Sequence, residues 1–249
     1  MLDVSRYPSP EAEGTTAVYA IGDLHGRFDL MEAMEGAIRA DIVARRPAAP
    51  LICYLGDYID RGPSSAEIID RFATGFDDGV PRVYLRGNHE EQLLDFLDNP
   101  VDRGPSWTQY GGREALLSYG VSLPARPDAA AWLTARDALD AALPATHRRF
   151  LNELRLAFVW RDYVFVHAGL DPARPVTDQS PRDLVWIREP FSSSSTDWGY
   201  RVVHGHVIVD RPVFRPNRIG IDTGAYYSGR LTCVAIDDTG TRIIEVREA

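Results

Sequence analysis

The sequence predicts an α/β protein with a mostly parallel β-sheet covered by helices, followed by a second sheet that is mixed or antiparallel. Two observations support this fold class. Over the first hundred residues, apolar strand-like runs alternate with segments of helical periodicity, which is typical of parallel sheets. After residue 160, short apolar runs recur with turn signals between them, which favours mixed or antiparallel pairing. With 249 residues, the chain is long enough for one large domain with a sizeable core.

Each element of the first half has its own signal. Apolar runs predict three strands, at residues 17–21, 51–55 and 82–86. Apolar residues at helical spacing predict three helices, at residues 28–44, 64–72 and 90–98. The residues before the first strand, 1–16, are predicted to be a polar lead-in.

The second half begins with a change of character. Residues 100–155 contain proline, glycine and alanine-rich helical stretches and no convincing strand, so we expect a helical insertion in a single domain of residues 1–249. A long loop is predicted at 171–199. Five strands are predicted around the loop, at residues 163–166, 201–203, 219–221, 231–236 and 243–246.

Composition excludes several classes of function. The formal net charge of -9 disfavours generic binding to nucleic acid or to an anionic membrane, because both need clustered lysine and arginine. No apolar run approaches the length of a membrane span, and the N-terminus has no signal-peptide core. Cys53 and Cys233 lie in apolar runs, as buried free thiols of a reducing compartment do. We therefore expect a cytoplasmic protein with no nucleic-acid or membrane partner.

Polar residues, most of them flanked by glycine, follow five of the predicted strands. The phrases are Gly22-Asp23-Leu24-His25-Gly26, Gly56-Asp57-Tyr58-Ile59-Asp60-Arg61-Gly62, Gly87-Asn88-His89-Glu90, His167-Ala168-Gly169 and His204-Gly205-His206. Strand ends are where α/β proteins place their chemistry, and glycine permits the tight turns that such a site needs. We therefore expect these phrases to form one site.

The residue types and their spacing predict a two-metal site. Asp23 and His25 are two residues apart, so in extended backbone their side chains point the same way and suit one ion. Two dications about 3.5–4 Å apart need a shared anion, which Asp57 can supply. The second ion would add three more ligands, Asn88, His167 and His206. Carboxylate, amide and imidazole ligands without thiolate favour manganese, iron or zinc.

The neighbouring residues predict acid catalysis and phosphate binding. His89, next to Asn88, can protonate a leaving alkoxide, and Asp60 can orient His89 and keep it protonated. Arg61 and Arg188 can bind the non-bridging phosphate oxygens, with Asn88 as a further substrate contact. Hydrolysis of a phosphate ester by in-line displacement is the reaction that needs this set.

The five phrases, in this order across about residues 20–225, resemble the signature of the phosphoprotein phosphatase family of calcineurin-like metallophosphoesterases. The compact bacterial and phage members resemble the chain most, and their IDTGA phrase is similar to residues 221–225. The resemblance implies a central β-sandwich of mixed sheets flanked by helices, and two divalent ions, commonly manganese. It also implies His206 rather than His204 as a ligand, and no regulatory subunit. A W-x-x-N-G-G phrase of the relatives is similar to residues 107–112, with Tyr110 in place of the asparagine.

The resemblance implies a serine/threonine protein phosphatase, in which a hydroxide activated by two metals attacks phosphorus and a histidine is the acid. The alternative is a dinucleoside polyphosphate hydrolase or another small-molecule phosphoesterase, because such relatives share almost the same motifs. The acidic balance of the chain mildly favours a basic phosphopeptide over a polyanionic nucleotide. A phosphoprotein-binding module without activity would lack a ligand or the acid, and none is missing here.

Overall fold

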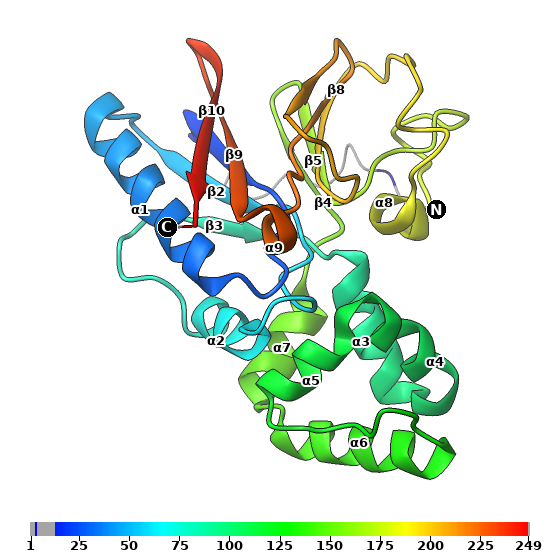
Figure 1. Cartoon of the computed structure of the whole chain (residues 1–249). Helices are drawn as coiled ribbons and strands as arrows, with labels where there is room; N and C mark the ends of the chain where they lie inside the picture. Colours follow the sequence, from blue (N-terminus) through cyan, green and yellow to red (C-terminus); the bar gives the residue numbers. More distant parts are fainter. Residues whose placement is uncertain (1–2, 4–12, 249) are drawn as a thin grey trace.

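The computed structural model describes residue 3 and residues 13–248, and their strands form two five-stranded sheets that face each other (Figure 1). The strand orders are β10-β9-β1-β2-β3 in the first sheet and β4-β5-β6-β8-β7 in the second. Both sheets are mixed and flanked by helices, so the predicted fold class is confirmed. Most of the predicted lead-in, residues 1–16, lies outside the described residues.

The first sheet contains β1 (Ala17–Ile21), β2 (Pro50–Tyr54), β3 (Arg82–Tyr84), β9 (Arg230–Asp237) and β10 (Gly240–Arg247). β1, β2 and β3 are parallel, while β9 runs antiparallel to both β1 and β10. The second sheet contains β4 (Ala157–Trp160), β5 (Tyr163–Val166), β6 (Arg201–His204), β7 (Val213–Phe214) and β8 (Arg218–Gly220). In it β5, β6 and β8 are parallel.

The expectation that the second half would form a sheet of its own is only partly correct. The C-terminal hairpin of β9 and β10 belongs to the first sheet, where β9 pairs with β1. The physical reason lies in β9, whose residues 231–236 are all buried. A strand that is apolar on both faces needs cover on both sides, and a central position in the sandwich provides it.

Alternating side chains of β1 and β2 divide the core into two layers. Val18 and Cys53 point toward the second sheet, where they join a cluster with Phe165. Tyr19 and Tyr54 point the other way and pack in a second cluster beneath the helices. Both faces of β1 and β2 are therefore buried, and the carboxyl ends of these parallel strands lie on a rigid support.

The helices cover the sheets and extend beyond one edge of the sandwich (Figure 1). α1 (Phe28–Arg45), α2 (Ser65–Thr74) and α3 (Asn88–Asp98) follow the first three strands, and α8 (Pro181–Trp186) lies within the predicted loop of 171–199. The predicted insertion is helical: α4 (Pro100–Trp107), the kinked η3 (Thr108–Gly112), α5 (Arg113–Ser118), α6 (Ala129–Ala142) and α7 (Ala145–Glu153). A last short helix is α9 (Ala225–Ser228). Among the described residues, no helix combines the length and the apolar character needed to cross a bilayer.

Candidate active site

The five phrases meet around one cavity at the carboxyl ends of the strands. The cavity has a volume of about 190 Å³, and seven predicted site residues line it: His25, Asp57, Arg61, Asn88, His89, Arg188 and His206. The other three lie directly behind it. The carboxylate of Asp23 accepts a hydrogen bond from the His206 backbone, Asp60 contacts His89, and His167 contacts Asn88. The structure therefore brings all ten predicted site residues together.

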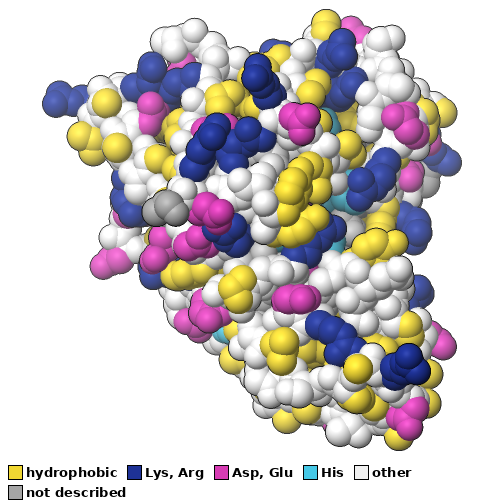
Figure 2. Space-filling view, viewed as in Figure 1, with side chains coloured by type: hydrophobic (Ala, Val, Ile, Leu, Met, Phe, Trp, Pro, Cys, Tyr) yellow, Lys and Arg dark blue, Asp and Glu magenta, His cyan; other side chains and the backbone are white. Residues whose placement is uncertain are grey.

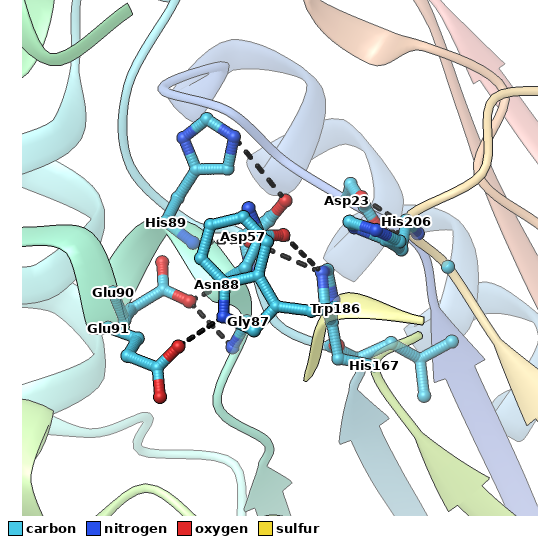
Figure 3. Close-up of polar contacts among 12 residues, drawn as sticks. Asp23, Asp57, Gly87, Asn88, His89, Glu90, Glu91, His167, Trp186 and His206 are labelled. Atoms are coloured by element: carbon cyan, nitrogen blue, oxygen red, sulfur yellow. Dashed lines mark hydrogen bonds and ion pairs between the residues drawn. The ribbon is translucent and has the colours of Figure 1, made fainter. Parts of the chain in front are cut away.

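Asp57 lies at the centre of this group (Figure 3). Its Oδ2 atom is 3.5 Å from His25 Nε2, and its Oδ1 atom is 3.4 Å from His167 Nε2. Asp57 Oδ1 also accepts a hydrogen bond of 3.1 Å from the backbone of His89, at the start of α3. A Cβ on Gly87 would lie 2.1 Å from Asp57 Oδ1, so only glycine allows this approach. One carboxylate thus faces both groups of candidate ligands.

Two histidines are held with their Nε2 atoms toward Asp57. His25 Nδ1 lies 3.0 Å from the carbonyl of Ile59, and His167 Nδ1 lies 2.9 Å from the carbonyl of Leu55. A carbonyl can only accept, so each Nδ1 carries a proton, and each Nε2 is left to face the Asp57 carboxylate. Backbone carbonyls commonly orient metal-binding histidines in this way.

The donor atoms fit a pair of divalent ions. Two groups of residues place ligand atoms within 4.8 Å of one another: His25, Asp57 and His89, and Asp57, His167 and His206. The buried Nε2 of His206 has no hydrogen-bond partner among the described residues, as expected for an atom reserved for a metal. Asp23 lies behind the first group rather than in it, and stays a predicted ligand. Oxygen and imidazole donors suit divalent metals in general, so manganese stays a prediction.

Charge in the cavity favours a bound cation. Burial raises the pKa of Asp23, and the carboxylates of Asp222 and Asp57 raise it further. Burial also opposes the charge of Asp57, but His167 and His89 outweigh it and hold the pKa of Asp57 well below its usual range. Burial lowers the pKa of His206 to about 2, so its imidazole is neutral, the form that binds a metal.

His89 and Asp60 form a buried pair on one side of the cavity. His89 Nδ1 donates a hydrogen bond of 2.6 Å to Asp60 Oδ2, which leaves Nε2 on the cavity side. Burial lowers the pKa of His89, but the carboxylates of Asp57 and Asp60 outweigh it, and the net shift is upward. This arrangement is the one that a proton-donating histidine needs.

The two predicted phosphate-binding arginines reach the cavity from different elements. Arg61 Nη2 lies 3.4 Å from His89 Nε2, and the guanidinium of Arg61 stacks 4.5 Å above the ring of Tyr226. Arg188 follows α8, which Trp186 ties to α3 by a hydrogen bond to the Glu91 carboxylate (Figure 3). Arg61 therefore places a positive charge beside the pair of His89 and Asp60, and Arg188 adds a second one from the chain that follows α8.

The backbone of the site adopts an unusual conformation. Five predicted site residues have positive φ angles between 46° and 72°: His25, Asp57, Asp60, Arg61 and His206. Left-handed backbone is uncommon outside glycine and concentrates at functional sites, where the surrounding structure holds it in place. These turns redirect the chain after the strands and aim successive side chains at one cavity.

Three residues of the site were not predicted. The Glu90 carboxylate accepts hydrogen bonds from the backbones of Asp57, Tyr58 and Gly87, and so joins the second phrase to the third. Asp222 lines the cavity, and burial raises its pKa to about 6. Trp107 donates a hydrogen bond to Asp60. All three stand inside phrases already singled out, Trp107 at the start of residues 107–112, but only the fold shows that they contact the site.

Comparisons with known proteins agree with this fold and with a phosphoesterase. The model of the calcineurin-like phosphoesterase family matches residues 16–230, and the chain belongs to that family. The phosphoesterase class of the site and its suitability for divalent metals are therefore established.

Several relatives are similar over most of their length. The asymmetrical bis(5'-nucleosyl)-tetraphosphatase PrpE of Anoxybacillus flavithermus is 25% identical over 89% of this chain and 91% of its own. PrpE of Bacillus cereus strain 03BB102 is 27% identical, with the same coverage of both chains. The fold also resembles a solved structure described as a candidate diadenosine tetraphosphatase, with a TM-score of 0.59, 20% identity and coverage of 97% and 96%. A cold-active protein tyrosine phosphatase has a TM-score of 0.61, 16% identity and coverage of 94% and 77%.

Proposed function

We propose that this protein is a metal-dependent hydrolase of dinucleoside tetraphosphates. The observation that carries the proposal is the match, along 89% of the chain, to relatives named as asymmetrical bis(5'-nucleosyl)-tetraphosphatases. The expectation of a serine/threonine protein phosphatase thus becomes the alternative. The net charge does not oppose a nucleotide, because Arg61 and Arg188 both line the cavity.

Tyrosines near Arg61, a residue that lines the cavity, support a nucleotide substrate. Tyr226 lies under the Arg61 guanidinium, and the ring of Tyr227 is 5.1 Å from the ring of Tyr226, one step further out. The backbone carbonyl of Tyr110 lies 3.4 Å from the Nε atom of Arg61. The side chains of Tyr110 and Tyr227 are more than half exposed. Exposed aromatic rings beside a phosphate-binding arginine suit stacking by a nucleobase.

The surface shown in Figure 2 is chemically mixed. In Figure 2, histidine side chains are visible in the middle of the face, beside arginine or lysine and hydrophobic side chains. A dinucleotide presents the same combination, with anionic phosphates between two apolar bases. The exposed tyrosines and the arginines therefore match its two kinds of surface.

The residues of the chain have separate roles in the proposed reaction. When bound, divalent ions supply Lewis-acid stabilisation of phosphate charge and acidify water. Arg61 and Arg188 bind and orient the phosphates. In net terms, water adds its hydroxyl group to phosphorus, and the bond from phosphorus to the bridging oxygen breaks. The released oxygen takes a proton from His89 Nε2, while Asp60 holds Nδ1. The proton that the water gives up restores the one lost by His89, so that the reaction balances.

A substrate panel tests the proposed function. The manganese-loaded protein should hydrolyse diadenosine tetraphosphate with a kcat/KM at least about 100-fold higher than for phosphoserine, phosphothreonine or phosphotyrosine peptides, a difference of about 2.7 kcal/mol. Chromatography should show ATP and AMP, the products of asymmetrical cleavage, rather than two ADP. A preference for any of the peptides would reject the proposal in favour of a protein phosphatase.

The tyrosines give a second, independent test. Tyr227→Ala should raise KM for diadenosine tetraphosphate about 10-fold, because stacking on one base contributes on the order of 1–3 kcal/mol. Hydrolysis of p-nitrophenyl phosphate, which has no base, should stay unchanged, and Tyr227→Phe should retain the wild-type KM. Equal KM values for the alanine variant and the wild type would show that Tyr227 does not hold a base.

A further inference from the structure

The helical insertion contacts the acid pair directly. Trp107, the last residue of α4, is fully buried, and its Nε1 donates a hydrogen bond of 2.8 Å to Asp60 Oδ2. The same oxygen accepts the bond of 2.6 Å from His89 Nδ1. The other oxygen of Asp60 is buried and has no partner among the described residues. Both side-chain donors to Asp60 thus converge on one atom.

The residues after Trp107 hold the neighbouring arginine. The Gly111 carbonyl accepts a hydrogen bond of 3.1 Å from the backbone of Arg61, and the Tyr110 carbonyl is 3.4 Å from Arg61 Nε. Gly111 has a φ of 108°, and a Cβ there would lie 2.6 Å from the backbone nitrogen of Arg61. The kinked segment η3 therefore lies directly on the backbone that carries Asp60 and Arg61.

The position of the Trp107 ring is itself tightly determined. A Cβ on Gly112 would lie 2.5 Å from two ring atoms of Trp107, and the Phe96 ring is 4.8 Å away on α3. A ring enclosed in this way cannot move independently of the insertion, because packed interiors leave little free space. Its N–H bond is thus a fixed donor.

We propose that Trp107 is a positioning residue: its hydrogen bond to Asp60 fixes the orientation of His89. Through Trp107, the helical insertion would thus orient the proton donor. The inference rests on the proposed phosphoester hydrolysis with His89 as proton donor. With one free oxygen, the Asp60 carboxylate could turn about its last torsion, since such torsions are broad and nearly two-fold. The indole N–H holds Oδ2 in place, and Oδ2 in turn holds the imidazole.

Trp107→Phe removes the N–H group and keeps an aromatic ring in the space. On phenyl phosphate, whose leaving group needs a proton, kcat should fall about 10-fold with KM within about twofold, as for residues that orient active-site ligands. On p-nitrophenyl phosphate the loss should be smaller. Trp132→Phe is the matched control, because Trp132 is buried in the same insertion and its indole makes no hydrogen bond to the described residues. It should leave both rates unchanged.

A double-mutant cycle separates positioning from general damage. In the His89→Asn background, Trp107→Phe should change kcat by less than about twofold, because the group it aims is already absent. The metal content and melting temperature of Trp107→Phe should match those of the wild type. An undiminished loss in that background, or the same loss in Trp132→Phe, would overturn the proposal.

A spectroscopic test is independent of turnover. The chain has five tryptophans, and the indole resonance of Trp107 in the zinc-loaded protein is identified by its absence in Trp107→Phe. Asp60→Asn should move this resonance more than the other four, because the acceptor loses its charge. An unmoved resonance would reject the contact, whatever the substrate. Wild-type protein without phosphoesterase activity would instead reject the proposed function.

Discussion

Replacing His89 with asparagine should lower kcat on phenyl phosphate by about 10²–10⁴-fold, the usual contribution of a positioned general acid. His89 Nδ1 is bound to Asp60, and Nε2 lies on the cavity side, where a leaving oxygen would take its proton. The loss should be much smaller on p-nitrophenyl phosphate and on diadenosine tetraphosphate, because their leaving groups are less basic. Steady-state kinetics with the manganese-loaded variant measure both effects.

Two further measurements make the His89 result specific. His89 lies in the first group of candidate ligand atoms, so metal content distinguishes a ligand from an acid. It should remain at the wild-type level, because His89 is not among the predicted ligands of either ion. His147→Asn makes the same change in a buried histidine of the insertion, away from the cavity, and should leave kcat within about twofold. A His89→Asn variant with the full rate on phenyl phosphate would exclude His89 as the acid.

The second large effect is expected at Asp57. Asp57→Asn keeps the size of the side chain and removes the charge that faces both groups of candidate ligands. Two neighbouring cations then repel without a shared anion, so we expect metal content to fall below two ions per chain and kcat/KM to fall at least about 100-fold. Elemental analysis after dialysis and titration calorimetry with manganese measure the loss.

A matched control is available for this substitution. Asp102 lies exposed on α4, and Asp102→Asn removes one negative charge from a residue outside the groups of candidate ligands. It should bind metal as the wild type does. If Asp57→Asn retained two tightly bound ions, Asp57 would not be the bridging ligand.

The fold could be predicted from the sequence where periodicity was strong. The buried strands β1, β2 and β5 and the helices that follow the first three strands lie within a few residues of their predicted positions. The partners of β9 could not be predicted, because an apolar run indicates a buried strand but not the strands with which it pairs. β4 lies next to the helical insertion and was not predicted, although its four residues form an apolar run like those of the predicted strands.

The candidate site was predictable because its polar residues occur in short sequence motifs directly after predicted strands. Carboxylates, imidazoles and an amide after five strands indicated a common site, and the structure gathers them around one cavity. Trp107 could not be predicted as a member, since a tryptophan in a helical stretch is ordinarily a core residue. Only the packing of the insertion on the Asp60 turn reveals its contact. The substrate depends on the exposed rim, where no short phrase specifies a partner.

The left-handed backbone of the site implies a trade-off between the stability of the fold and its function. Each non-glycine residue in this conformation costs roughly 1–2 kcal/mol relative to ordinary backbone, and five predicted site residues carry it. Glycine at any of them would relieve that cost and delete a predicted ligand, the carboxylate that pairs with His89, or an arginine of the cavity. Selection for a more stable chain therefore acts against selection for a working one at these positions. Stabilising substitutions for this enzyme should be sought in the sheets and helices, away from the turns that follow the strands.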